Sequence, residues 1–187
     1  MPPRTGGCGV ATVRVTPLCS PALDARLSSL GFDDIDPTFG MIADIGDASI
    51  DPRVDLSPQP ARDWIAANAA SYGGVKADAT KLAAILDRIR PQAAFAALID
   101  DGAPCAWGIG VIERGLIGLQ DITVAPPLRG RGVGRALIAS LMGWGRANGA
   151  SRAYLHVLAS NEPARALYRR LGFADAFLMH HRIRRAA

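Results

Sequence analysis

The sequence contains few cysteines and few aromatic residues. Its three cysteines, Cys8, Cys19 and Cys105, are odd in number and lack the paired spacing of a metal site. Such cysteines are typical of free thiols in a reducing compartment, so we expect a cytoplasmic protein that holds no metal. Aromatic residues make up only 6% of the chain, which leaves little surface for stacking nucleic-acid bases.

Long apolar runs are also absent. No window approaches the roughly 18 uninterrupted apolar residues that a membrane-spanning helix needs. The N-terminal stretch MPPRTGGCGV lacks the apolar segment of a signal peptide. We therefore expect no membrane association. Apolar residues nevertheless form 49% of the 187 residues, which is enough for the core of one domain.

Lysine is scarce as well, because Lys76 and Lys81 are the only lysines among 21 basic residues. The net charge of +4 favours an anionic ligand. The arginines are scattered along the chain and are not interleaved with aromatic residues. We therefore expect no nucleic-acid partner, and the basic C-terminal stretch HHRIRRAA is interpreted as a solvated end.

Hydrophobic periodicity and turn residues predict an α/β protein. From residue 53 onward the predicted order is β-α-α-β-β-β-α-β-α-β, which is typical of a mixed α+β arrangement with a mixed central sheet and helices on both faces. Strands are expected at 10–18, 38–45 and 53–56 among other places. Helices are expected at 20–32, 57–73, 76–91 and 132–148, and a further short helix at NEPARALYRRLGF.

The stretch PLRGRGVGRALIASL (127–141) places three glycines immediately before an apolar helical run. Unpaired N–H groups and the macrodipole make a helix N-terminus attractive to anions, and glycines let a ligand approach the backbone. Two nucleotide-binding motifs are excluded. The Walker A motif needs a lysine that is absent here, and the dinucleotide fingerprint needs a glycine where Arg135 stands.

The loop and a later segment together carry a specific resemblance. Arg129, Gly132 and Gly134 fit the pattern R/Q-x-x-G-x-G/A. The pattern N-x-x-A-x-x-x-Y-x-x-x-G-F is matched at Asn161, Ala164, Tyr168, Gly172 and Phe173. With a helix and a strand between them, these motifs resemble the GNAT superfamily of N-acetyltransferases over residues 107–182. Residues 53–106 fit the family's order of elements without distinctive motifs.

The resemblance implies acetyl-CoA as co-substrate and assigns its contacts. The backbone at Val124 would pair with the pantetheine arm, and Asn161, with Ala164 in the same motif, would lie beside it. Each assignment has a structural alternative: a capped helix with nothing bound, a core valine, solvated arginines, or an ordinary N-cap at Asn161. The pyrophosphate would be bound by Arg129, Gly130, Arg131, Gly132, Val133, Gly134 and Arg135.

The resemblance also implies catalytic roles. Tyr168 would protonate the departing thiolate or orient the thioester, the alternative being a buried aromatic residue of a helix. Attack by an amine requires a base, for which Asp121 and His156 are the main candidates and Glu113 a third. Either main candidate has a structural alternative, a capped turn for Asp121 and a strand histidine for His156. Near the C-terminus, His180, His181 and Arg182 are expected to border the acceptor pocket.

Together these features predict an acetyl-CoA-dependent N-acetyltransferase. It would transfer the acetyl group to a primary amine of a small molecule or peptide by direct attack. The alternative is a CoA-binding sensor or interaction module without turnover. Which amine is used cannot be read from the mixed charges of the helices at 57–91.

One internal similarity suggests a two-part organisation. ALDARLSSLGF (22–32) aligns without gaps with PARALYRRLGF (163–173). Either any short helix that ends in LGF looks alike, or the similarity is a half-repeat. In the second case residues 1–47 resemble the back half of a degenerate GNAT domain, and residues 48–187 form the complete domain. The exposed sheet edge of such a fragment would pack on the main domain or on a second subunit, so we expect a homodimer.

Overall fold

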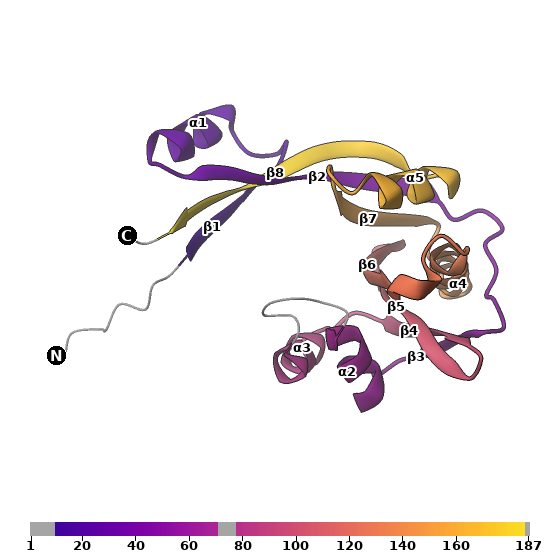
Figure 1. Cartoon of the computed structure of the whole chain (residues 1–187). Coiled ribbons are helices and arrows are strands. Elements are labelled where there is room, and N and C mark those ends of the chain that lie inside the picture. The colour runs from indigo at the N-terminus through magenta and orange to yellow at the C-terminus, as the bar shows by residue number, and fades with distance from the viewer. Residues whose placement is uncertain (1–9, 71–77, 186–187) are drawn as a thin grey trace.

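The computed structural model describes residues 10–70 and 78–185 (Figure 1). The strands are β1 (Val10–Val15), β2 (Asp33–Asp44), β3 (Val54–Ser57), β4 (Ala93–Asp100), β5 (Ala103–Glu113), β6 (Leu116–Val124), β7 (Arg152–Leu158) and β8 (Ala174–Arg185). The helices are α1 (Pro21–Ser29), α2 (Arg62–Ala70), α3 (Ala79–Leu86), α4 (Val133–Ala147) and α5 (Glu162–Arg170). A short 3-10 helix, η2 (Pro126–Leu128), precedes α4.

The strands form one sheet in the order β1-β8-β2-β7-β6-β5-β4-β3. Neighbouring strands are antiparallel except for β6 and β7, which are parallel. Helices α4 and α5 contribute Leu137 and Tyr168 to one core cluster, whereas α2 and α3 contribute Trp64 and Leu82 to another. The predicted mixed sheet with helices on both faces is confirmed. No helix in the described ranges is long and apolar enough to cross a membrane.

Several predicted boundaries are wrong. Strand β2 begins at Asp33 and not at residue 38, and α2 begins at Arg62 and not at residue 57. Pro58 and Pro60 explain the late start of α2, because the residue before a proline is driven away from helical geometry. The end of one predicted helix and the start of the next fall within 71–77, outside the described residues.

The N-terminal strands are interleaved with the C-terminal ones. Strand β2 lies between β7 and β8, which follow one another along the chain with only α5 between them. Reciprocally, β8 lies between β1 and β2, which are separated in the sequence only by α1. Figure 1 shows α1 and α5 on the same side of β2 and β8. Neither β-α-β unit therefore pairs its own two strands with each other.

The two units also match in detail. Both helices end at a glycine with positive φ, 75° at Gly31 and 87° at Gly172. The next amide then bonds back to the helix, from Phe32 to the Leu27 carbonyl at 3.1 Å and from Phe173 to the Tyr168 carbonyl at 3.0 Å. Such bonds satisfy carbonyls that a helix end leaves unpaired.

The alignment of 22–32 with 163–173, extended into the following strands, brings Thr38 opposite Met179. These two residues are direct partners in the β2–β8 ladder. The two β-α-β units are thus related by an approximate two-fold rotation about this pair, which superimposes β2 on β8. The assignment of 1–47 as a degenerate half-domain and of 48–187 as the complete one remains a prediction.

Met41 on β2 tests whether the N-terminal segment is part of the main core. Its side chain is 1% exposed and lies in the cluster that includes α4 and α5. We expect Met41→Ala to lower the free energy of unfolding by about 2–5 kcal/mol, because the truncation leaves a cavity. Urea denaturation followed by circular dichroism measures this. Leu18→Ala, at a residue 97% exposed, is the matched control, and equal effects of both substitutions would contradict the packing of β2.

Candidate functional site

An opening in the sheet is created where β6 and β7 separate. Their parallel pairing runs from Leu116 opposite Arg152 to Leu119 opposite Leu155 and then stops. Beyond this point β6 continues to pair with β5 through Thr123 and Val124. On its other side β6 forms no ladder with β7 beyond Leu119, so an extended ligand can pair with the edge of β6 near Val124.

Strand β6 bulges at the same place. The ladder with β5 shifts register between Gln120 and Thr123, and Asp121 adopts a φ of 50°. A bulge bends a strand and re-aims its side chains. Asp121 is half-buried in this bulge, and its role as one of the two main base candidates stays a prediction.

The predicted glycine loop lies directly after this free strand edge. Gly130 and Gly132 have φ values of 74° and 82°, which favour glycine. No atom lies within 4 Å of where a Cβ would stand on either residue. Helix α4 then begins at Val133 without any side-chain cap from Gly132. The loop and the first turn of α4 (130–135) thus form an open cradle of backbone amides, which suits an anion. The Arg129 amide, expected in the same set, instead donates to the Pro126 carbonyl at 3.3 Å.

The arginines of the loop differ in their surroundings. Arg129 donates from Nε to the Val124 carbonyl at 3.1 Å, so its side chain bridges the strand end and the loop. Arg131 and Arg135 are exposed beside the cradle. The sequence anticipated a charged rim here but not the bond that ties Arg129 to Val124.

Helix α5 closes the same region from the other side. A Cβ on Gly134 would stand 3.4 Å from both Val124 and Leu167, so α4, β6 and α5 meet closely at this glycine. The N-cap, which was the structural alternative for Asn161, is present, since the side chain accepts from the Ala164 amide at 3.3 Å. That cap uses the oxygen of the Asn161 amide and leaves its NH₂ group to other partners. The contact of Asn161 with pantetheine stays a prediction.

Tyr168 is 8% exposed and packs edge-to-face on Phe173, with ring centroids 5.9 Å apart. Burial raises the pKa of the Tyr168 hydroxyl, so the group is a proton donor at neutral pH. Its hydroxyl makes no hydrogen bond to the described residues. The geometry therefore leaves the hydroxyl able to donate to a ligand.

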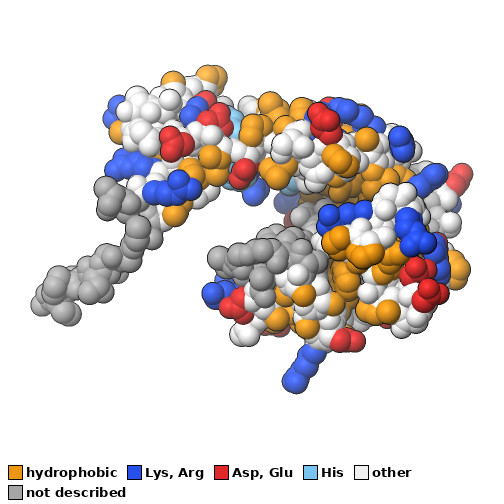
Figure 2. Space-filling view, viewed as in Figure 1, with side chains coloured by type: hydrophobic (Ala, Val, Ile, Leu, Met, Phe, Trp, Pro, Cys, Tyr) orange, Lys and Arg blue, Asp and Glu red, His pale blue; other side chains and the backbone are white. Residues whose placement is uncertain are grey.

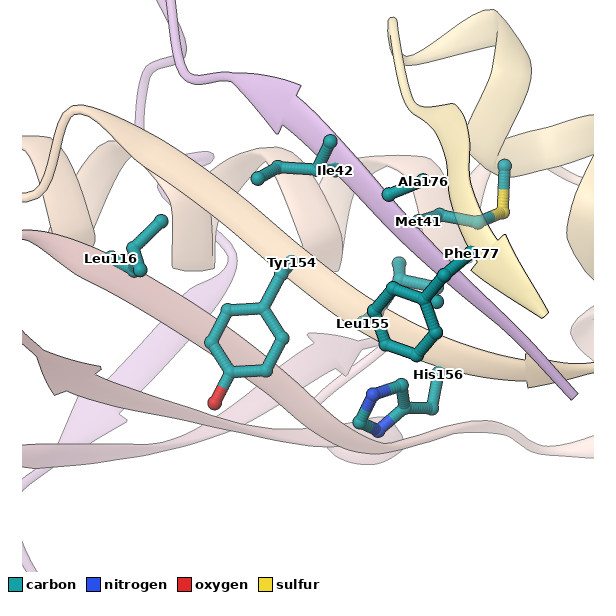
Figure 3. A pocket seen from close by; sticks show the side chains of 9 residues that line it. Met41, Ile42, Leu116, Tyr154, Leu155, His156, Ala176 and Phe177 are labelled. Atoms are coloured by element: carbon teal, nitrogen blue, oxygen red, sulfur yellow. The ribbon is translucent and has the colours of Figure 1, made fainter. Parts of the chain in front are cut away.

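His156 follows Leu155, the last β7 residue paired with β6, and its ring lies on the face opposite α4 and α5. Tyr154 and Phe177 flank this ring at 6.1 and 5.9 Å between centroids (Figure 3). Desolvation by these neighbours, together with the positive charge of Arg14, lowers the pKa of His156 below its ordinary value. The ring is consequently neutral at pH 7 and able to accept a proton.

The structure does not bring four of the expected residues, Glu113, His180, His181 and Arg182, to this opening. Glu113 lies at the β5–β6 turn, at the far end of β6, and pairs with Arg114 at 4.0 Å. His180 and Arg182 turn toward α1, where both bond Asp24 at 3.0 and 2.8 Å. His180 and Arg182 lie away from the opening because the alternation of β8 places both side chains on the face that α1 covers. Those bonds hold the pKa of Asp24 far below its usual range.

His181 lies on the other face of β8 from its two neighbours. There its ring accepts a hydrogen bond from Arg14 Nε at 3.2 Å. A pocket on that face was not anticipated, and it is lined in part by Gly40, Tyr154 and Phe177. The available signal was the alternation of β7, in which Tyr154 and His156 fall on one face, but no local pattern shows that β2 lies beside them.

A family model for the acetyltransferase (GNAT) family matches residues 61–173. The chain belongs to this family. The match contains the free edge of β6, the glycine loop and α5 up to Phe173. Members of this family are described as acetyltransferases.

Two curated proteins are similar to parts of the chain. An uncharacterized N-acetyltransferase of Bacillus subtilis, YobR, is 36% identical over 101 residues, which cover 54% of this chain and 41% of that protein. Streptothricin acetyltransferase of Streptomyces lavendulae is 45% identical over 56 residues, 30% of each chain. The chain spans less than half the length of these two relatives.

Solved structures share the fold. A GCN5-related N-acetyltransferase from Kribbella flavida has a TM-score of 0.68 at 17% identity, covering 94% of this chain and 68% of that one. A tandem GNAT protein from the clavulanic acid biosynthesis pathway has a TM-score of 0.71 at 15% identity, covering 95% and 64%. These similarities extend over the N-terminal strands as well as the region that the family model matches.

We expect the His156 imidazole to titrate below its ordinary pKa of 6.5. Replacing Arg14 with Gln should raise the pKa of His156, because it removes a cation that opposes protonation. A pH titration of the imidazole resonances by NMR measures both values. Arg170→Gln, which removes an exposed arginine of α5, should leave the His156 titration unchanged. An unshifted value in Arg14→Gln would show that the two side chains do not interact.

Proposed function

We propose that the chain is an acetyl-CoA-dependent N-acetyltransferase that acts on a primary amine of a small molecule or peptide. One observation carries the proposal: an uncapped glycine loop at the start of α4 adjoins a strand edge that has lost its partner. The loop suits a pyrophosphate, and the edge suits the amide groups of a pantetheine arm. No other part of the described chain combines both features.

The residues present fit this co-substrate. The amides from Gly130 to Arg135 would hold the pyrophosphate, and the side chains of Arg131 and Arg135 would face its charges. The backbone at Val124 and the free NH₂ of Asn161 would contact the pantetheine arm. Ala164 would lie beside the pantetheine arm without a backbone hydrogen bond to it, since the Ala164 amide already donates to the Asn161 side chain.

The reaction would proceed by direct attack. The amine nitrogen bonds to the acetyl carbonyl carbon, the carbon–sulfur bond then breaks, and the thiolate leaves with the bonding electrons. The attacking nitrogen loses a proton to a base, and Tyr168 donates one to the thiolate. His156 suits the role of base because its ring is neutral at pH 7. Asp121 is the second candidate, either as base or as a carboxylate that stabilises the cationic amine.

We propose a cytoplasmic protein with no nucleic-acid partner. We also propose a homodimer, because β1 ends the sheet and its outer edge has no strand partner among the described residues. Light scattering across a wide concentration range would show a strict monomer if this assembly is wrong.

Gly132 provides a test of the cradle. We expect Gly132→Ala to weaken acetyl-CoA binding at least tenfold, because a Cβ would enter the cradle and the residue would be strained at a φ of 82°. Gly149→Ala is the matched control, with a φ of 88° and equally open surroundings but a position at the far end of α4. It should lose similar stability and keep its affinity in isothermal titration. Equal loss of affinity in both variants would contradict the cradle.

A substitution of Tyr168 distinguishes an acetyltransferase from a CoA-binding module without turnover. We expect Tyr168→Phe to lower kcat by about 10²-fold or more, since general acid catalysis typically contributes that much. Titration with CoA should give an unchanged Kd, because the phenyl ring keeps the packing on Phe173. A thiol-release assay with a panel of amines provides kcat. Absence of acetyl transfer by the unaltered chain to every amine, with intact CoA binding, would favour the sensor.

A further inference from the structure

The face of the sheet opposite α4 and α5 carries a cavity over β6, β7, β2 and β8. Its volume is about 280 Å³. Figure 2 shows the molecule hollowed between the part that carries α1 and the part that carries α2 and α3. The lining residues that matter here are Gly40, Ile42, Leu116, Tyr154, His156 and Phe177.

Two glycines let aromatic rings lie flat on this face. A Cβ on Gly40 would overlap the ring of Phe177, its partner in the β2–β8 ladder. A Cβ on Gly118 would stand 2.7 Å from the ring of Tyr154, its partner in the β6–β7 ladder. Each ring thus covers the backbone of a glycine on the next strand. The result is an aromatic surface, which we call the acceptor floor, made by Tyr154, His156 and Phe177, with the His156 ring at 67° and 69° to the other two.

The acceptor floor is continuous with the opening in the sheet. His156 belongs to both, because it follows the last paired residue of β7 and lines the cavity. Its ring packs edge-to-face against the two other rings of the floor (Figure 3). A molecule lying on the floor would therefore have one end beside the neutral imidazole at the opening.

The chemistry of the cavity limits what it can bind. Among the described residues that line it there is no carboxylate, and apart from His156 and the Tyr154 hydroxyl their side chains are apolar. A polyamine would bring several positive charges to a wall that offers no opposite charge. A flat apolar body would be well matched, because aromatic rings pack edge-to-face or offset against one another.

We propose that the acceptor is a primary amine carried on an aromatic or other flat apolar group, whose body lies on the acceptor floor. The N-terminal segment is then part of the specificity of the enzyme, since β2 supplies Gly40 and Ile42. The amino group lies toward His156 and the opening. This inference rests on the proposed function for the acetyl transfer, but the binding itself can be measured alone.

The test compares amines of the two kinds on the full chain in the presence of CoA. Phenethylamine and tryptamine serve as aromatic probes and spermidine as the polycation, with affinities from isothermal titration or ligand-observed NMR. We expect the aromatic amines to bind at least tenfold more tightly than spermidine. Equal affinities, or tighter binding of spermidine, would overturn the proposal.

Two variants locate the binding. Phe177→Ala removes a ring of the floor, and Gly40→Ala keeps that ring but displaces it. Each substitution should weaken the binding of phenethylamine at least tenfold. The matched control is Leu178→Ala, because Leu178 is 50% exposed against 38% for Phe177 and points to the opposite face of β8. It should change the affinity less than twofold. Phenethylamine binding that survives Phe177→Ala unchanged would overturn the proposal.

Two other results would distinguish an error in the assignment of the acceptor floor from an error in the proposed acetyl transfer. If the unaltered chain is a dimer and Phe177→Ala a monomer, the floor is an interface between two copies and the proposal is wrong. If phenethylamine binds as expected but is never acetylated, the floor stands as a binding surface and the proposed function fails. Steady-state kinetics complete the comparison, with Phe177→Ala expected to raise KM for phenethylamine more than it lowers kcat.

Discussion

The separation of β6 from β7 beyond Leu119 and Leu155 is the constraint on which the rest of the site depends. Backbone groups that lose a strand partner must find another one, because leaving them unpaired in a buried place is costly. The chain places the uncapped start of α4 at the same end of β6. Unpaired groups of a strand and of a helix thus meet at one opening, which can bind an extended amide chain and an anion together.

Helix α4 makes this opening rigid. Leu137, Ile138 and Leu141 are fully buried against the sheet, and the Ser140 hydroxyl accepts from the Asp51 amide while it donates to the Ala136 carbonyl. An exposed glycine loop is ordinarily a mobile element. Because this one continues directly into a helix anchored along its length, its amides are held in position before any ligand arrives, which lowers the entropic cost of binding.

The sequence was informative where structure and chemistry are local. The glycine loop, the Asn161 cap and the glycine helix ends each depend on a few adjacent residues, and the order of elements follows from periodicity. The interleaving of β2 and β8 could not be derived, because pairing between remote strands leaves no periodic signal in either one. The acceptor floor could not be predicted for the same reason, because Gly40 and Phe177 lie on remote strands that become neighbours only in the folded sheet. His180 and Arg182 were misplaced because the face of β8 depends on α1.

The interleaving has a consequence for the order in which the protein folds. Strand β1 pairs only with β8, so it stays without a sheet partner until synthesis has passed Arg185. Strand β2 likewise waits for β7 on one side and β8 on the other. Contacts between such distant parts of a chain form slowly, since a long loop must close first. The edges of β1 and β2 therefore stay exposed until β8 has been made, and an exposed strand edge can pair with another chain.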